Sequence, residues 1–364
     1  MNTILNHPDI DAYLLYFLDI KSIVLMVTLC KNQYHILNKC VGELLSAKSI
    51  DIEYIVTYAA QNSYIKLLQW IHDSVNKFVY SNITMNVAAL NGNCLVLQWF
   101  YESPYKIYET QNLYVNAGRK NHITVLDWLQ IHGYKIEQVC YIIDVACKYG
   151  NIDVLDWLHN SEYKWRYTFY AIDTACKYGN TCILDWFRDN GYEFIYSSDA
   201  IDLACKNGYV CVLDWFRNNA YKMVYTCKAV NLACENNHID VIKWFDKYDY
   251  EFKYTDSNVC NGINSVEILE WFFYSKYKLS SYYLTFDKAM STNNIEIIQW
   301  FKSKKINFEN FSGRKSSDWV SSWVNYNKKN YYKLNNIKEI RISSGEYIDD
   351  NYIKRWYCTI PDEW

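Results

Sequence analysis

Tryptophan recurs through most of this chain at a fixed interval, and that spacing constrains the fold more than any other feature. Neighbouring members of the series are 29 residues apart, with a single interval of 27 between Trp244 and Trp271. The series is Trp70, Trp99, Trp128, Trp157, Trp186, Trp215, Trp244, Trp271 and Trp300. A period of this length is typical of repeat architectures, in which each repeat is one supersecondary unit. The chain is therefore expected to be an array of small units.

Further columns share this period and predict two short helices in each unit. Eleven residues before the tryptophan the column reads Ala59, Ala88, Ala117, Ala146, Ala175, Ala204, Ala233, Cys260 and Ala289. Within 171–180, Ile172, Ala175 and Cys176 have the i, i+3, i+4 spacing of one buried helical face. A second helix follows within 182–192, and its apolar face is formed by Ile183, Leu184, Trp186 and Phe187.

Glycines and a short extended stretch separate these helices. Gly150, Gly179 and Gly208 follow the first helix, where a left-handed C-cap is needed, and Gly133 and Gly191 follow the second. The stretch Tyr-Glu-Phe-Ile-Tyr at 192–196 alternates with period 2, which predicts an extended connector. Because one such unit cannot bury its apolar face alone, the units are expected to stack into an all-α solenoid.

The period divides the chain into three parts. Residues 1–53 precede the repeats and form a head, and residues 313–364 lose the spacing and are expected to be an irregular C-terminal cap. Between them lie nine units, at 54–82, 83–111, 112–140, 141–169, 170–198, 199–227, 228–254, 255–283 and 284–312.

The units resemble ankyrin repeats. The run A-C-K-Y-G-N-T-C-I-L-D-W-F-R-D-N-G-Y at 175–192 follows the ankyrin spacing without a gap. Two departures are that Ala-Ile-Asp at 171–173 and 200–202 replaces the usual Thr-Pro-Leu-His start, and that each unit is about four residues shorter than the usual length of about 33. The resemblance implies short loops and a concave binding face. Overall, the chain is similar to ankyrin-repeat proteins encoded by giant viruses of amoebae.

The head resembles an F-box. Its pattern is a proline after His7, a leucine-rich helix, a break, and the run Thr-Leu-Cys-Lys at 28–31, although His7 stands where leucine is usual. The residues that would bind an adaptor are Pro8, Leu14, Leu15, Leu18, Ile20 and Ile23. The resemblance implies docking on the Skp1 adaptor of cullin ubiquitin ligases of a host. The alternative is an N-terminal cap that covers the first apolar face of the solenoid.

Tyrosines are the candidate partner-binding residues of the repeats. Tyr167, Tyr196, Tyr225 and Tyr254 form a column on the connectors, and Tyr149 and Tyr178 end two first helices. The resemblance places both regions on the concave binding face, and tyrosine is enriched at interfaces because it offers a large amphipathic surface at low entropic cost. The alternative is that these rings complete the core of the repeats.

The charges predict solvated surfaces. Aspartates precede lysines by four residues on three first helices, in Asp144/Lys148, Asp173/Lys177 and Asp202/Lys206, and such pairs stabilise a helix if exposed. A lysine column runs along the connectors: Lys77, Lys106, Lys135, Lys164, Lys222 and Lys278. The net charge of -3 does not favour a nucleic-acid partner, and no apolar segment is long enough for a membrane partner.

No motif predicts catalysis, a cofactor or a metal site. Among the thirteen cysteines, Cys147, Cys176, Cys205 and Cys234 form one column and Cys182 and Cys211 a second. The cysteines of these two columns are expected to be small buried residues at helix contacts. His122 and His238 are expected to make structural hydrogen bonds near the turn between helices. With no secretory signal at the N-terminus, the expected location is intracellular, in the cytoplasm.

These observations favour a non-catalytic protein that binds other proteins through its solenoid. A sharper hypothesis is a substrate adaptor, in which the head recruits a Skp1–cullin ligase while the repeats select the target. Two other classes stay open: a purely structural scaffold without a ligase link, and a nucleic-acid binder whose affinity would fall steeply with salt.

Overall fold

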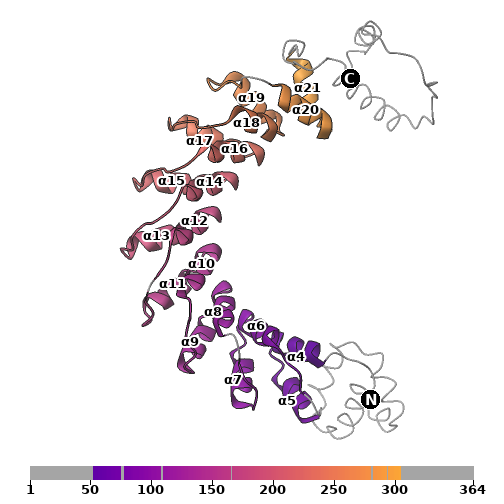
Figure 1. Ribbon diagram of the computed structural model, residues 1–364, viewed down its shortest axis with the longest axis vertical. Coiled ribbons are helices and arrows are strands. Elements are labelled where there is room, and N and C mark those ends of the chain that lie inside the picture. Colours follow the sequence, from indigo (N-terminus) through magenta and orange to yellow (C-terminus); the bar gives the residue numbers. More distant parts are fainter. Residues whose placement is uncertain are drawn as a thin grey trace, which may run out of the picture.

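The computed structural model describes residues 52–74, 78–107, 110–164, 166–279, 282–292 and 294–304. These residues form eighteen helices and no strand, which confirms the predicted all-α class (Figure 1). The residues predicted to bind an adaptor and the C-terminal segment 313–364 lie outside the described residues.

The described helices alternate between two sets that differ in position. The even-numbered, inner helices are α4 (Ile52–Gln61), α6 (Asn82–Leu90), α8 (Thr110–Arg119), α10 (Val139–Tyr149), α12 (Phe169–Lys177), α14 (Asp199–Lys206), α16 (Cys227–Glu235), α18 (Asp256–Gly262) and α20 (Tyr283–Thr292). The odd-numbered, outer helices are α5 (Ile65–Ser74), α7 (Cys94–Glu102), α9 (Ile123–Ile131), α11 (Ile152–His159), α13 (Thr181–Asp189), α15 (Val210–Asn218), α17 (Ile239–Lys247), α19 (Val266–Tyr274) and α21 (Ile295–Ser303).

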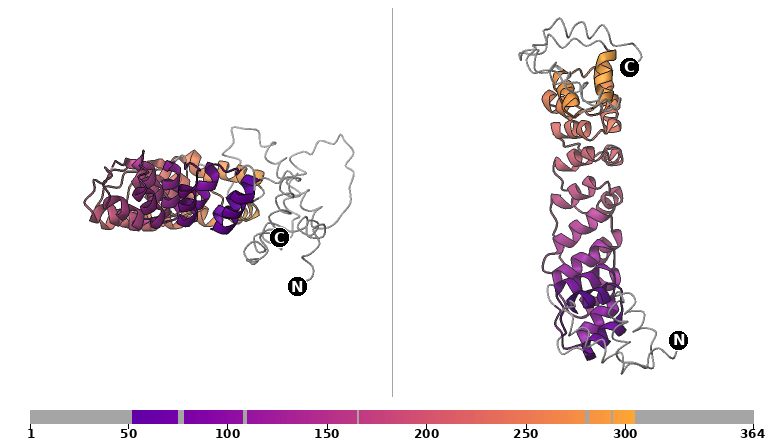
Figure 2. Two further views of the ribbon diagram at one scale, coloured as in Figure 1. Left: turned by 90° about the horizontal axis from the view of Figure 1, so that it is seen from below. Right: turned by 90° about the vertical axis from the view of Figure 1, so that its right-hand side faces the viewer.

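The helix pairs stack into a curved array. The inner helices line the concave side of the arc and the outer helices its convex side (Figure 1), and the right-hand view of Figure 2 looks onto the concave side. Inner contacts are made by small side chains such as Ala175 and Ala204, both fully buried, whereas the outer layer holds the rings of Trp186 and Phe187. Because small residues let helices approach closely and rings hold them apart, the array bends toward its inner layer.

The inner helices from α4 to α16 end in the same left-handed turn, whereas α18 ends at Ile263 with a φ of -58°. After α12, the Asn180 N–H donates to the Ala175 carbonyl at 2.9 Å and the Gly179 N–H donates to the Cys176 carbonyl at 3.1 Å, which is the Schellman arrangement. The alanine column therefore also supplies the acceptor of this turn. Glycine takes the left-handed residue at Gly179 (φ 74°), and asparagine takes it at Asn237 (φ 62°).

Side chains at the start of the outer helices cap the inner helix of the preceding pair. The Nδ2 of Asn180 donates to the carbonyls of Cys147 and Lys148, at 2.8 and 3.0 Å. His122 takes the equivalent position and its Nε2 lies 3.1 Å from the Leu90 carbonyl, so the predicted structural role of His122 is confirmed. These bonds satisfy carbonyls that a helix C-terminus leaves without an intrahelical partner.

The tryptophans join the outer helices by a ladder of indole hydrogen bonds. Six indole N–H groups donate to the residue that precedes the tryptophan of the previous pair, at 2.7 to 3.0 Å. The acceptor and donor pairs are Gln69–Trp99, Gln98–Trp128, Asp127–Trp157, Asp156–Trp186, Asp185–Trp215 and Asp214–Trp244. For the next tryptophan, Trp271, the position of the acceptor is occupied by Lys243, whose side chain has no acceptor atom. One step later Glu270 pairs with Lys304 at 3.1 Å, and the buried Nε1 of Trp300 has no hydrogen-bond partner.

Two glycines with the same backbone conformation test the tight contact between pairs. Gly208 (φ 75°) and Gly191 (φ 71°) are both left-handed, but a Cβ on Gly208 would lie 2.5 Å from the His238 ring, whereas a Cβ on Gly191 would meet nothing within 4 Å. We expect Gly191→Ala to lower the free energy of unfolding by about 1 kcal/mol and Gly208→Ala by about 2–4 kcal/mol. Urea unfolding followed by circular dichroism measures both losses. Equal losses would mean that the His238 contact adds nothing to the cost of the backbone conformation.

Candidate functional site

A row of exposed and half-exposed cations and tyrosines lies at the C-terminal ends of four inner helices. Its members come from α8, α10, α12 and α14 and from the residues directly after them. We define the basic–aromatic band as Arg119, Lys120, Lys148, Tyr149, Lys177, Tyr178 and Lys206. It belongs to the concave layer of the array, the layer that Figure 2 shows from the front in its right-hand view.

The tyrosine rings of the band lie between its cations. Lys148 Nζ is 5.3 Å from the centroid of the Tyr149 ring and 5.2 Å from that of Tyr178, so one ammonium contacts two rings. Arg119 lies 5.7 Å from the Tyr149 ring and Lys177 lies 5.5 Å from the Tyr178 ring. Tyr149 is 43% exposed and Tyr178 36% exposed, which leaves both rings open to a partner. Cation–π contacts of this kind hold the ring and the charge close together at the surface.

The cations of the band have no carboxylate partner among the described residues. The ion pairs of that part of the chain are made by outer helices, the turns after them and connectors, such as Arg188–Asp185 at 2.9 Å and Lys243–Glu267 at 2.9 Å. The structure thus pairs charges on its convex layer and leaves the cations of the band without salt bridges.

The predicted Asp–Lys pairs on the inner helices are not formed. Asp173 and Asp202 are 5% and 1% exposed, and both point into the contact with the next connector. There Asp173 accepts hydrogen bonds from the backbone N–H and the hydroxyl of Ser197, and Asp202 accepts from Thr226 at 2.9 and 2.6 Å. The prediction was wrong because both carboxylates are buried. Burying a charge is costly unless it is hydrogen-bonded, and the donors of the next connector supply those bonds.

Asp144 occupies the same column but lacks these donors. The residue 24 positions later, Thr168, caps α12 by accepting from the Tyr170 N–H, as Thr226 caps α16, but unlike Thr226 it donates no hydrogen bond to the aspartate of its column. The buried Oδ1 of Asp144 has no hydrogen-bond partner. Burial without compensating bonds raises the pKa of the Asp144 carboxyl to about 6.

The four connector tyrosines are tied into the scaffold. The hydroxyl of Tyr167 donates to the Glu193 carbonyl. The equivalent bond is 2.6 Å long from Tyr196, 2.7 Å from Tyr225 and 3.4 Å from Tyr254. Burial raises the pKa of Tyr225 to about 12, and the ring is only 9% exposed. These bonds give the four tyrosines a structural role in joining successive connectors. Partner binding by them stays a prediction.

The structure does not bring the two sets of tyrosines together. The connector tyrosines precede the N-termini of inner helices, whereas Tyr149 and Tyr178 stand at their C-termini, and a helix of nine residues is about 13 Å long. Sequence reasoning selected Tyr149 and Tyr178 but not the cations around them. The cations could have been found from the repeat pattern. The position nine residues before the tryptophan is basic in four consecutive units, at Arg119, Lys148, Lys177 and Lys206.

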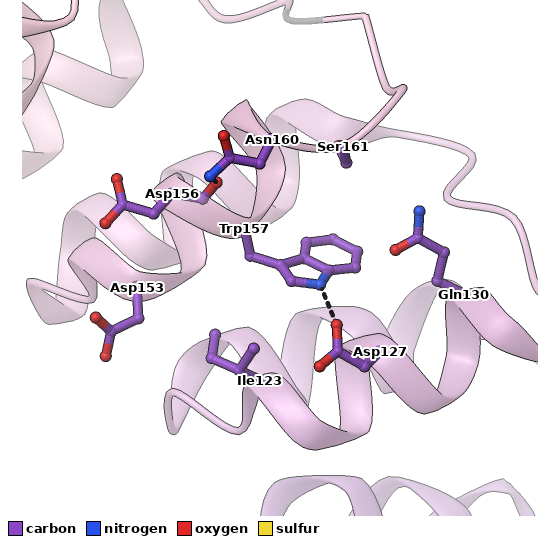
Figure 3. A pocket seen from close by; sticks show the side chains of 8 residues that line it. All are labelled: Ile123, Asp127, Gln130, Asp153, Asp156, Trp157, Asn160 and Ser161. Carbon is purple, nitrogen blue, oxygen red and sulfur yellow. Dashed lines mark hydrogen bonds between the residues drawn. The ribbon is translucent and has the colours of Figure 1, made fainter.

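A hollow of about 420 Å³ lies on the other layer, between α9 and α11 (Figure 3). Three carboxylates line it, but each already accepts a hydrogen bond from the scaffold at 2.7 Å. The acceptor–donor pairs are Asp127–Trp157, Asp153–Asn121 and Asp156–Trp186. The polar groups of the hollow therefore serve the contacts between helix pairs.

The cysteines follow the predictions in one column and not in the other. Cys147, Cys176 and Cys205 are fully buried, as is Cys234, which confirms the first column as small core residues. Cys182 and Cys211 are exposed, so the prediction for the second column was wrong. These two thiols lie near the start of outer helices, two residues before the buried leucine, on the solvent side of the layer.

Among the described residues, no group of three or more histidine, cysteine, aspartate or glutamate side chains lies close enough together to hold a metal ion. In that same part of the chain, every helix is too short or too polar to cross a bilayer.

The class that the architecture defines is an all-helical array of repeated helix pairs. No protein-family model and no curated protein matches this chain.

The buried carboxylate of Asp144, whose Oδ1 has no hydrogen-bond partner, predicts how the stability of the folded protein depends on pH. Because its pKa is raised in the folded state, the folded protein binds the proton more tightly than the unfolded chain, and stability falls as pH rises from about 4 to about 6. We expect Asp144→Asn to be more stable than the parent protein by roughly 1 kcal/mol at pH 7.5, after a discount for partial exposure, and to show little gain at pH 4. Urea unfolding at both pH values measures this, with Asp240→Asn, which removes an exposed carboxylate, as the control. A gain that is equal at the two pH values would refute the explanation.

Proposed function

We propose that this protein is a non-catalytic binding protein, an ankyrin-like solenoid that recognises another protein through its concave layer. Two kinds of observation support the ankyrin-like assignment. One is the repeated pair of short helices, and the other is the left-handed turn after the inner helix together with the extended stretch before the next. The repeats still differ from the usual ankyrin repeat at the start of the first helix and in their shorter length. The ankyrin-like assignment therefore rests on the spacing of the residues in 175–192, which follows the ankyrin pattern.

The basic–aromatic band carries the proposal of binding. Its cations are exposed or half-exposed and without carboxylate partners, and on α12 and α14 the carboxylates of Asp173 and Asp202 are used in the contact with the next connector instead. Its two tyrosines present partly exposed rings among those cations. Interfaces are enriched in tyrosine and arginine, and unsatisfied charge of one sign is the surface that an oppositely charged partner complements.

A second proposal concerns the head and rests on the sequence pattern of residues 8–31. An F-box-like head would dock on the Skp1 adaptor, and the solenoid would then present a bound protein to a cullin ligase. The proposed docking residues are Pro8, Leu14, Leu15, Leu18, Ile20 and Ile23. The two proposals are independent, because a binding solenoid needs no ligase.

Charge reversal on the band tests the binding proposal. We expect the double variant Lys148→Glu with Lys177→Glu to lose the proteins that the parent chain captures from a eukaryotic lysate, because the band would then repel an acidic partner. The matched control is Lys66→Glu with Lys247→Glu, which makes the same change of net charge on two outer helices. Quantitative mass spectrometry of the captured proteins measures the outcome, and unchanged circular dichroism establishes that the variants fold. Equal capture by all three proteins would refute the proposal.

Substitution in the head tests the adaptor proposal separately. We expect the full chain to bind purified Skp1 and the variant Leu14→Asp with Leu18→Asp to lose that binding, because a docking face of leucines would become charged. The band variant should bind Skp1 as the parent does, which makes it the control. Surface plasmon resonance measures all three. A parent chain that does not bind Skp1 would leave the head as a cap of the solenoid.

A further inference from the structure

We infer that the ligand of the basic–aromatic band is an extended acidic protein segment whose carboxylates recur at every third residue. This inference rests on the proposed binding function and adds the class of partner. It follows from the number of cations, their spacing and the rings between them.

The cations are confined to a short stretch of the array. In the column nine residues before the tryptophan, four consecutive pairs contribute Arg119, Lys148, Lys177 and Lys206. The positions before this run are Gln61 and Leu90, and the position after it is Glu235. A ligand that matches this pattern carries about four negative charges and does not continue along the whole solenoid.

The spacing of the cations sets the spacing of the ligand charges. Packed helices lie about 8–10 Å apart, and each step along the column crosses one inner helix to the next. A chain in the extended polyproline II conformation advances about 3.1 Å per residue with three residues per turn, so three residues span one step and bring every third side chain to the same face. Four cations in a row therefore face a segment of about ten residues with an acidic side chain at positions i, i+3, i+6 and i+9.

The tyrosines provide the contacts between the charges. Tyr149 and Tyr178 follow Lys148 and Lys177 directly, and Lys148 lies between the two rings. The two residues between successive carboxylates of the ligand would lie over these rings, which accept apolar and backbone groups alike. A segment with small residues at those positions fits better than a block of adjacent acids, whose inner charges would face rings.

The charge balance favours a protein segment over nucleic acid. The whole chain has a net charge of -3. The column contributes one cation per helix pair, with Lys120 beside Arg119, which makes a single row rather than a wide basic field. Non-specific nucleic-acid binding depends on neutralising many phosphates at once, commonly six to ten. A row of four cations matches a few carboxylates and falls short of that number.

The experiment uses the full chain and three labelled probes. The first is a twelve-residue peptide of four Glu-Ser-Ala repeats, the second is a peptide of the same composition with its four glutamates adjacent, and the third is a twelve-nucleotide oligothymidylate. Fluorescence anisotropy gives each dissociation constant in low salt and again in 0.15 M salt. The parent chain, the band variant Lys148→Glu with Lys177→Glu and the control Lys66→Glu with Lys247→Glu are compared.

We expect the spaced peptide to bind at least about fivefold more tightly than the adjacent-glutamate peptide and more tightly than the oligonucleotide. The band variant should weaken binding of the spaced peptide by about tenfold or more, the control should change it by less than about twofold, and salt should weaken it. Equal binding of the two peptides, tighter binding of the oligonucleotide, or equal weakening in band variant and control would overturn the inference.

Failure of the inference and failure of the proposed function give different results. If none of the probes binds while the band variant still loses the proteins captured from lysate, the band binds a partner of another chemistry, and only the acidic segment is refuted. If band variant and parent capture the same proteins, the binding function of the band itself is refuted.

Discussion

Each helix pair in this array is completed by hydrogen bonds from the pair that follows it. Asn180 caps the carbonyls of the preceding inner helix, the Trp186 indole donates to Asp156, and Thr226 donates to the buried Asp202. In all three contacts the later pair supplies the donor and the earlier pair the acceptor. Because a polar group buried without a partner costs about 1–3 kcal/mol, the pairs cannot separate without exposing these groups or leaving them unsatisfied. The apolar layers give the array its cohesion, and these bonds fix how one pair sits on the next.

The same bonds explain why the concave layer keeps cations without carboxylate partners. The aspartates that share a helix with Lys177 and Lys206 are withdrawn into the scaffold, where they hold the next connector. Carboxylates on the outer helices accept indole bonds and also pair with arginine or lysine, as Asp185 does. The scaffold uses these acidic side chains at its internal contacts, so the C-terminal ends of α12 and α14 present cations without carboxylate partners.

Much of the fold could be predicted from the period alone. The tryptophan interval, the alanine column and the glycines after the helices indicated paired helices, and Ala175 and Gly179 take the expected core and left-handed positions. The direction of Asp173 could not be predicted, because an acid four residues before a lysine can either pair with it or turn inward, and only the position of Ser197 decides. The same limit applied to Cys182, where small size was consistent with burial but the helix places it outward. In the candidate site, the tyrosines of the band were predicted and its cations were not, because an assumed partner on the same helix removed them from consideration.

The end of the indole ladder has a consequence for how the array loses its structure. In a solenoid, stability is close to a sum of the stabilities of single units and of the contacts between neighbours. Beyond α17 the ladder meets Lys243 instead of an acceptor, and the Trp300 indole is buried without one. The contacts among the last helix pairs therefore contribute less to the stability of the array than the contacts between earlier pairs. Fraying should begin there and proceed toward the centre, while the pairs from α4 to α17, which the ladder joins and which include those that carry the band, remain the cooperative block that opens last.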